Sequence, residues 1–376
     1  MRNPEMREQF VTFMGNMITN QHAEPAPPLR EDEEYWYLPT FGFYHPKKPG
    51  QLRIVFDSSA KHSGISLNGI LLTGPDLNNS LVGVLIQFRK EQVAVTTDIQ
   101  QMFHCFYVYE DHRNFLRILW YRDNDMSKDL MDYRVRVHIF GNSPSPAVAI
   151  YGLRRAIKEG AQEHGVDTVE FVERHFYMDD GLISLPSEEE TVDLLQRTQA
   201  SFGESNLRLH KFASNQQGIM DAFPPEDCAA GVRDLDLGEE TPPIQRSLGL
   251  CWEIAKDTFT FMVSTGDKPF TRRGVLSVVN SVFDPLGLVT PIIIQGRALL
   301  RELTMDTNDW DAPLPEEKCS QWETWRDSLQ DLNFMSHEHT HVYPYPRQCI
   351  KSCACFQMPQ QRPLAKMVML TLCNQY

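Results

Sequence analysis

Three aspartates are the residues of this chain whose type and setting could do chemistry. Asp98 ends a β-branched run that starts at Val93, and Asp179 and Asp180 stand side by side between two apolar segments. Mg²⁺ prefers oxygen ligands, and two such ions about 4 Å apart can stabilise the attacking and leaving oxygens of a phosphoryl transfer. The three carboxylates therefore predict a two-metal site, provided that the fold brings position 98 to the turn at 179–180.

Each part of this set also has a plainer interpretation. The run Asp179-Asp180-Gly181 could be an ordinary solvated hairpin turn, since an Asp-Gly pair is typical of such turns. Asp98 could cap a helix formed by residues 99–106. Only the combination of the three aspartates, in order and in context, favours metal binding.

The elements that must position these residues follow from the spacing of apolar side chains. Strands are predicted over residues 41–44, 51–57, 93–98, 115–121, 133–139, 172–177, 182–185, 248–252 and 258–263. Helices are predicted over residues 81–90, 147–158, 188–202, 276–283, 294–305 and 316–332. Mixed strands and helices that give way to helices predict an α+β fold with a smaller helical part at the end.

Composition sets limits on the class of protein. The chain has 376 residues, 41% of them hydrophobic and 23% charged, which is enough for two or three packed subdomains. It has neither a long apolar run nor a signal-peptide pattern, so we expect a soluble intracellular protein. The net charge of −14 argues mildly against a nucleic-acid partner, because phosphate contacts favour a basic footprint.

The eight cysteines are dispersed along the chain, which is typical of reduced thiols rather than of a disulfide framework. In the tail, three of them follow three alternating histidines, and this raises the alternative of a zinc site. Their spacing matches no standard zinc finger. The residues concerned are His337, His339, His341, Cys349, Cys353 and Cys355.

Five segments in order resemble the motifs of reverse transcriptases. They are Asp98–Phe103, Phe140–Pro146, Phe176–Asp180, Leu207–Asn215 and Ser247–Trp252. Further segments are similar, more narrowly, to the Pao/BEL class of long-terminal-repeat retrotransposons: Tyr37–Pro39, Leu52–Ala60, Ser66–Asn68, Gly74-Pro75 and Phe283–Leu288. The resemblance covers roughly residues 35–330. One departure is Phe140, which stands where many retroviral relatives have a glutamine. A phenylalanine side chain cannot hydrogen-bond a nucleotide.

The resemblance implies a right-hand polymerase palm, an antiparallel sheet with helices on one face, together with fingers and a partial helical thumb. It places the fingers and palm over residues 35–255. Residues 1–34 are polar, with prolines over 25–28 and acidic residues over 31–34, so their composition predicts a poorly packed lead-in after one short helix. A thumb or connection-like helical region would occupy 256–335, and a divergent tail with no recognisable ribonuclease H would occupy 336–376.

The resemblance also implies roles for single residues. Asp98, Asp179 and Asp180 would hold two Mg²⁺ ions, with Mn²⁺ as a substitute, and Lys211 would neutralise or protonate the pyrophosphate leaving group. Phe103 would exclude a 2′-hydroxyl and so select deoxynucleotides. The residues that would contact the deoxynucleotide are Arg53, Ile99, Phe103, Gly141, Ser143, Pro144, Tyr177 and Met178.

Plainer alternatives remain open for several of these residues. Arg53 could be a surface charge at a strand edge, and Lys211 could be a solvated lysine. Phe103 could be a core aromatic, and the Gly141–Pro144 loop could serve packing alone.

The activity implied is RNA-directed DNA polymerisation on an RNA or DNA template with a primer, within a polyprotein whose protease, ribonuclease H and integrase lie outside this chain. Such a protein would be cytoplasmic, in element particles, with the nucleus as an alternative, and would have no membrane partner. The rival interpretation is a catalytically inactive or co-opted fragment that at most binds nucleic acid. A metal-dependent nuclease or cyclase with a similar palm is a third.

Overall fold

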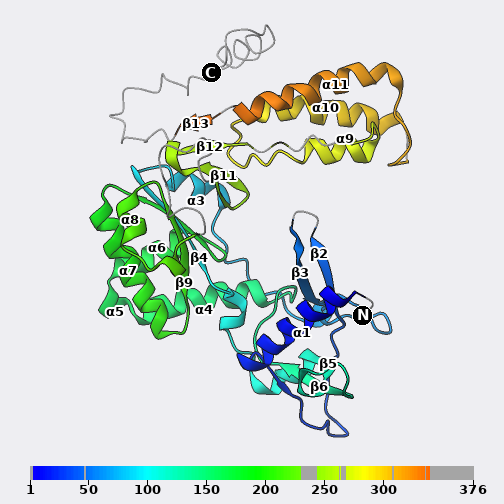
Figure 1. The fold of residues 1–376 in the computed structure, drawn as a ribbon, viewed down its shortest axis with the longest axis vertical. Helices are drawn as coiled ribbons and strands as arrows, with labels where there is room; N and C mark the ends of the chain where they lie inside the picture. The colour runs from blue at the N-terminus through cyan, green and yellow to red at the C-terminus, as the bar shows by residue number, and fades with distance from the viewer. Residues whose placement is uncertain are drawn as a thin grey trace. The chain divides into compact units, whose positions relative to one another are not determined.

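A computed structural model describes residues 3–45, 48–229, 244–261, 263, 268–306, 309–334 and 336–338, and its helices and strands are shown in Figure 1. The chain forms two compact units. The first comprises Met1–Asn78, Ile99–Glu173 and Leu195–Leu209, and the second comprises Asn79–Asp98, Arg174–Leu194 and His210–Tyr376. None of the helices in these described ranges is long and apolar enough to cross a membrane.

The first unit combines a three-stranded sheet, a two-stranded hairpin and several helices. The sheet has the order β1-β6-β5, and the hairpin pairs β2 with β3. Its strands are β1 (Ala23–Pro25), β2 (Thr40–His45), β3 (Lys48–Phe56), β5 (Arg117–Tyr121) and β6 (Leu130–Val135). Its helices are α1 (Pro4–Thr19), α2 (Leu67–Ile70), α4 (Ser145–Glu159) and α5 (Ala161–His164), with 3₁₀ turns at Met102–Cys105, Glu110–Leu116 and Arg122–Asn124.

Helix α1 packs more closely than the polar composition of residues 1–34 predicts. Its start is well capped, because the Asn3 side chain accepts hydrogen bonds from two backbone N–H groups of the first turn. Phe10, Met14 and Met17 lie on one face and are at most 2% exposed, within the core of the first unit. One short helix was predicted in this segment, and the observed helix is 16 residues long and well packed, because its three apolar residues form a stripe once they are spaced around the helix.

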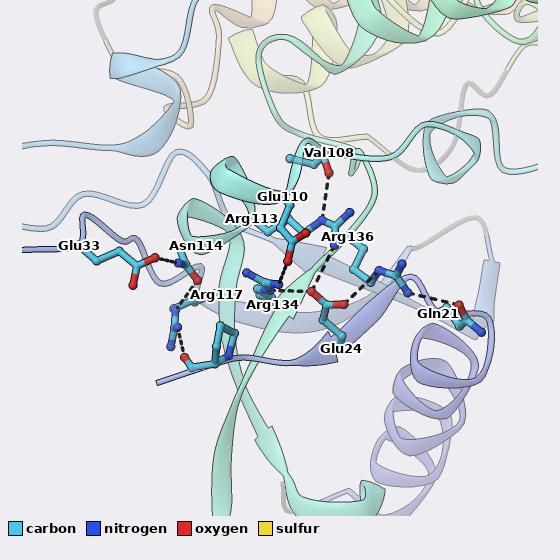
Figure 2. A network of polar contacts seen from close by, with 11 residues as sticks. Gln21, Glu24, Glu33, Val108, Glu110, Arg113, Asn114, Arg117, Arg134 and Arg136 are labelled. Atoms are coloured by element: carbon cyan, nitrogen blue, oxygen red, sulfur yellow. Dashed lines mark hydrogen bonds and ion pairs between the residues drawn. The ribbon is translucent and has the colours of Figure 1, made fainter. Parts of the chain in front are cut away.

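A group of charged side chains then fastens β1 to β6, as Figure 2 shows. The Glu24 carboxylate pairs with Arg113 at 3.4 Å, Arg134 at 2.6 Å and Arg136 at 3.2 Å. Partly buried charges of this kind are stable only when they are paired. The contacts join residues more than 85 positions apart in sequence, so the N-terminal segment is integral to the first unit.

The second unit contains two four-stranded sheets, with the orders β7-β8-β4-β9 and β10-β11-β12-β13. The strands are β4 (Val93–Ile99), β7 (Phe176–Tyr177), β8 (Asp180–Leu185), β9 (Leu209–Ser214), β10 (Ile244–Ser247), β11 (Leu250–Glu253), β12 (Thr258–Thr260) and β13 (Ser336–Glu338). The helices are α3 (Leu81–Gln87), α8 (Gln217–Asp221), α9 (Arg272–Val279), α10 (Thr290–Asp306) and α11 (Cys319–Ser328), while α6 (Val166–His175) and α7 (Glu188–Glu204) contribute to both units.

The largest difference from the predicted elements is the segment before the paired aspartates. Residues 172–177 are predicted as one strand, but α6 continues to His175 and only Phe176 and Tyr177 are extended. A short apolar run fits a buried helical face as well as a strand, so spacing alone could not separate them. The predicted strand over 133–139 is likewise shifted, because β6 spans Leu130–Val135.

The described residues from Arg272 to Phe334 are mainly helical, as predicted, and α9, α10 and α11 lie side by side in Figure 1. Asp284 accepts hydrogen bonds from the backbone N–H groups of Leu288 and Val289, both at 2.8 Å, and so fixes the entry to α10. The Trp325 ring lies over Gly296, where a Cβ would come within 2.1 Å of it. The predicted helix over 316–332 is divided into a 3₁₀ turn, α11 and a second 3₁₀ turn. Residues 339–376, with most of the candidate zinc ligands, lie outside the described part of the chain.

Candidate metal centre

Strand pairing brings the three aspartates into one neighbourhood. Asp98 on β4 is the direct partner of Asp180 on the antiparallel strand β8, and opposite residues of this kind have Cβ atoms about 5 Å apart. Both strands are anchored by buried side chains, such as Val95 and Leu182, each 1% exposed. The register is therefore set by the core, and the helix-cap alternative for Asp98 is wrong, because β4 continues through Ile99.

The hairpin that carries Asp179 is tighter than the predicted strands, which leave residues 178–181 between them, would make it. Tyr177 pairs with Asp180, so Met178 and Asp179 alone form the loop, and Gly181 already belongs to β8. Met178 has φ +56°, which fits a two-residue hairpin loop but is unfavourable for a residue with a side chain. This strained loop places the Asp179 carboxylate directly beside that of Asp180.

Gly181 makes the close approach of three strands possible. A Cβ at this position would lie 2.7 Å from the Phe176 ring and 2.9 Å from the Thr97 methyl group. Asn79 also donates a hydrogen bond of 2.7 Å to the carbonyl oxygen of Phe176. The strand that leads into the loop is thus held from both sides.

Strand β9 supplies two cationic or polar partners for Asp98. His210 Nε2 lies 3.0 Å from Asp98 Oδ1, and Lys211 Nζ lies 3.1 Å from Oδ2. The Lys211 side chain is 54% exposed, whereas those of His210 and Asp98 are 12% and 21% exposed. Lys211 is therefore available to a ligand as well as to Asp98. His210 was not among the predicted site residues, although it lies in the same motif as Lys211.

The electrostatics of the site disfavour three ionised carboxylates without a cation. Burial raises the pKa of Asp179, and the charge of Asp98 raises it further. Burial, followed by the charges of Asp179 and Asp98, raises the pKa of Asp180 from 3.8 to about 7. Lys211 opposes both shifts. Oxygen donors in mutual repulsion form a donor set that suits hard divalent cations.

The carboxylates do not all lie close enough together to hold one shared ion. Within the described ranges, the group whose ligand atoms all lie within 4.8 Å of one another is Glu163, His164 and Glu204, in the first unit. In the aspartate site, both oxygens of Asp98 are engaged by β9. Two ions about 4 Å apart, each with ligands at about 2 Å, span about 8 Å. The residues thus fit a pair of ions better than a single one.

The residues predicted to contact a nucleotide are divided between the two units. Tyr177 and Met178 are half-buried in the second unit, next to the paired aspartates. The others belong to the first unit: Arg53, Ile99, Phe103, Gly141, Ser143 and Pro144.

In the first unit, Arg53 is exposed on β3, and Phe103 is half-buried with its ring 6.0 Å from the exposed ring of Phe140. Gly141 has φ +100°, which explains a glycine at this turn. Ile99 is fully buried at 0% exposure, so its side chain packs in a core. The nucleotide-binding roles of these residues stay predictions.

Comparisons with known proteins show what this chain is similar to. A family model described as a Pao retrotransposon-like RNaseH-like domain matches residues 271–348. It covers α9 to α11, which the sequence analysis assigned to the thumb or connection, and it reaches into the tail. No curated protein matches the chain.

Among solved structures, the chain is similar to the foamy viral protease-reverse transcriptase solved in complex with double-stranded DNA. The TM-score is 0.57 at 12% sequence identity, with 89% of this chain and 49% of that chain covered. This chain thus spans about half the length of that protein. The likeness shows a shared mixed fold of helices and sheets.

Proposed function

We propose that this chain is the polymerase core of a retrotransposon reverse transcriptase, with palm, fingers and a partial thumb. The observation that carries the proposal is the register that sets Asp98 opposite Asp180, beside a strained two-residue loop that presents Asp179. An ordinary solvated turn requires neither a strained loop residue nor partly buried carboxylates. It also requires no partner aspartate 82 positions earlier in the sequence, which is the separation of Asp98 and Asp180.

The substrates would be an RNA or DNA template, a primer and deoxynucleoside triphosphates. The primer 3′-hydroxyl would form a bond to the α-phosphorus while the bond to the leaving pyrophosphate breaks. Asp98, Asp179 and Asp180 would hold two Mg²⁺ ions, which, when bound, stabilise the charge on the transferred group. Lys211, exposed beside Asp98, would neutralise or protonate the pyrophosphate.

A primer-extension assay on an RNA template with millimolar Mg²⁺ tests the proposal. The wild-type chain should extend the primer. Asp179→Asn should reduce extension by at least about 100-fold, because it removes a charged ligand of the metal ions that stabilise the transition state. Asp221→Asn is the matched control, since Asp221 lies exposed on α8. Equal extension by the wild type and Asp179→Asn would refute the polymerase proposal.

The rival is a catalytically inactive or co-opted fragment that binds nucleic acid. It predicts template binding with no extension by the wild type. A metal-dependent nuclease, the third interpretation, predicts shortened rather than lengthened labelled strands in the same assay, so one gel separates the three.

A further inference from the structure

The turn Gly141–Ser143 in the first unit is shaped by a side chain from a distant element. Asn68, on the short helix α2, donates from Nδ2 to the carbonyl oxygen of Gly141 at 2.8 Å. Its Oδ1 accepts a hydrogen bond from the backbone N–H of Ser143 at 2.9 Å. One amide group thus bridges both ends of the turn, across 73 and 75 positions of sequence.

Asn68 is itself held firmly in place. Its second Nδ2 hydrogen reaches Ser59 Oγ at 3.0 Å, and its backbone N–H donates to the Ser58 carbonyl oxygen at 2.9 Å. Asp57 accepts from the backbone N–H groups of Ser59 and Ala60, at 2.9 and 3.0 Å. The end of β3 therefore supports Asn68, and Asn68 supports the turn.

A second bond ties the middle of the turn to the same strand end. Ser58 Oγ donates to Asn142 Oδ1, and both side chains are buried, at 2% and 5% exposure. Gly141 and Ser143, on either side, are exposed and half-buried respectively. The turn is thus fixed from beneath while its outer groups stay open to a ligand, which is the arrangement expected of a pre-organised binding surface.

We propose that Asn68 is a positioning residue for the deoxynucleotide: its amide holds the Gly141–Ser143 turn in the shape in which Gly141, Ser143 and Pro144 meet the substrate. The inference rests on the proposed polymerase function. It gives a role to the segments Leu52–Ala60 and Ser66–Asn68, which the metal centre leaves unexplained.

The variants that test this proposal differ in which hydrogen bonds they keep. Asn68→Ala removes all side-chain bonds, whereas Asn68→Asp keeps the acceptor for Ser143 N–H and loses the donor to Gly141. Asn78→Ala is the matched control, because the Asn78 amide bonds only to Asp76 in its own turn, at 3.0 Å. Should Asn68→Ala fail to fold, Asn68→Asp carries the test.

Two measurements are made on the full chain with primer and template. The first is hydrogen–deuterium exchange of the peptide over residues 140–145, and the second is the KM and kcat for single-nucleotide incorporation. For Asn68→Ala we expect exchange at Ser143 and KM both to rise about tenfold, since loss of both hydrogen bonds to the turn weakens positioning in ground and transition states alike. We expect the kcat of Asn68→Ala to stay within about twofold of the wild-type value. In both exchange and KM, Asn68→Asp should be intermediate and Asn78→Ala should match the wild type.

Faster exchange with unchanged KM would overturn the proposal, because Asn68 would then be structural only, and unchanged exchange would overturn it as well. These results are distinguishable from failure of the proposed function. If the proposed polymerase function is wrong, the wild type itself incorporates no nucleotide and binds none with Ca²⁺ in place of Mg²⁺. Both proposals are then refuted.

Discussion

Replacing Asp180 with asparagine should stabilise the metal-free protein at alkaline pH. The native carboxylate is partly buried and lies beside two other aspartates, which raises its pKa from 3.8 to about 7. This gap of about 3 pH units corresponds to about 4 kcal/mol, at about 1.4 kcal/mol per unit. The amide has nearly the same shape and no charge, so the variant avoids this penalty.

The sign of the pH dependence follows from proton binding. A carboxyl group whose pKa is higher in the folded state binds more protons there than in the unfolded chain. The free energy of unfolding of the wild type should therefore fall as pH rises from about 4 to about 7, and stay low above that range. The difference between variant and wild type should be below about 1 kcal/mol at pH 4 and reach about 4 kcal/mol at pH 8.

Thermal denaturation in the presence of a chelator measures this difference. At pH 8 the variant should melt roughly 5–10 °C above the wild type, while at pH 4 the two should nearly coincide. Asp221→Asn controls for the change of one unit of net charge. Addition of Mg²⁺ at pH 8 should raise the melting temperature of the wild type more than that of the variant, because the cation relieves the repulsion that the variant lacks. A stabilisation of equal size at pH 4 and pH 8 would refute the reasoning, as would a variant that melts below the wild type at pH 8.

Three further substitutions separate chemistry from folding. Lys211→Ala should lower primer extension about 10- to 100-fold. The same substitution should change the free energy of unfolding by less than about 1 kcal/mol, because the Lys211 side chain in this ion pair with Asp98 is 54% exposed. A large loss of stability in chemical denaturation would contradict this. Phe103→Ala should admit ribonucleotides in the extension assay, and unchanged sugar selectivity would count against its predicted gating role. Gly181→Ala should destabilise the protein by about 1–3 kcal/mol in denaturant titration, because the new methyl group would meet the Phe176 ring at 2.7 Å; a neutral effect would show that the hairpin adjusts freely.

The sequence was most informative where spacing and chemistry coincide. The β-branched run that ends at Asp98 is strand β4, and the helix predicted to start near Pro144 is α4. The predicted mixture of strands and helices also agrees with the mixed fold that the structure shows. In each of these segments the local sequence preference and the pattern of buried side chains favour the same secondary structure. Tertiary packing therefore did not change the predicted element.

Other features could not be predicted because they depend on contacts between distant segments. The hairpin loop predicted over residues 178–181 is shortened to Met178-Asp179, since the register is set by the pairing of β8 with β4 and β7 rather than by the turn residues. The roles of Asn68 and Glu24 have no local signal, because the turn that Asn68 bridges and the Arg134 side chain that Glu24 pairs with lie more than 70 positions away. The only hint for Asn68 was its place in a segment that resembles retrotransposon sequences.

The site is held in a conformation that works against the stability of the fold. Met178 and Lys211 both have left-handed backbone conformations, at φ +56° and +54°, and such strain persists only where the surrounding structure imposes it. The carboxylates of Asp179 and Asp180 add an electrostatic penalty that burial increases. The buried pairing of β4 with β8 offsets these terms, yet a chain without a use for cations would be more stable with an amide at position 180 and a glycine at position 178. The strain at Met178 and Lys211 and the repulsion between the carboxylates therefore give the proposed metal centre a cost in stability, which bound cations would reduce.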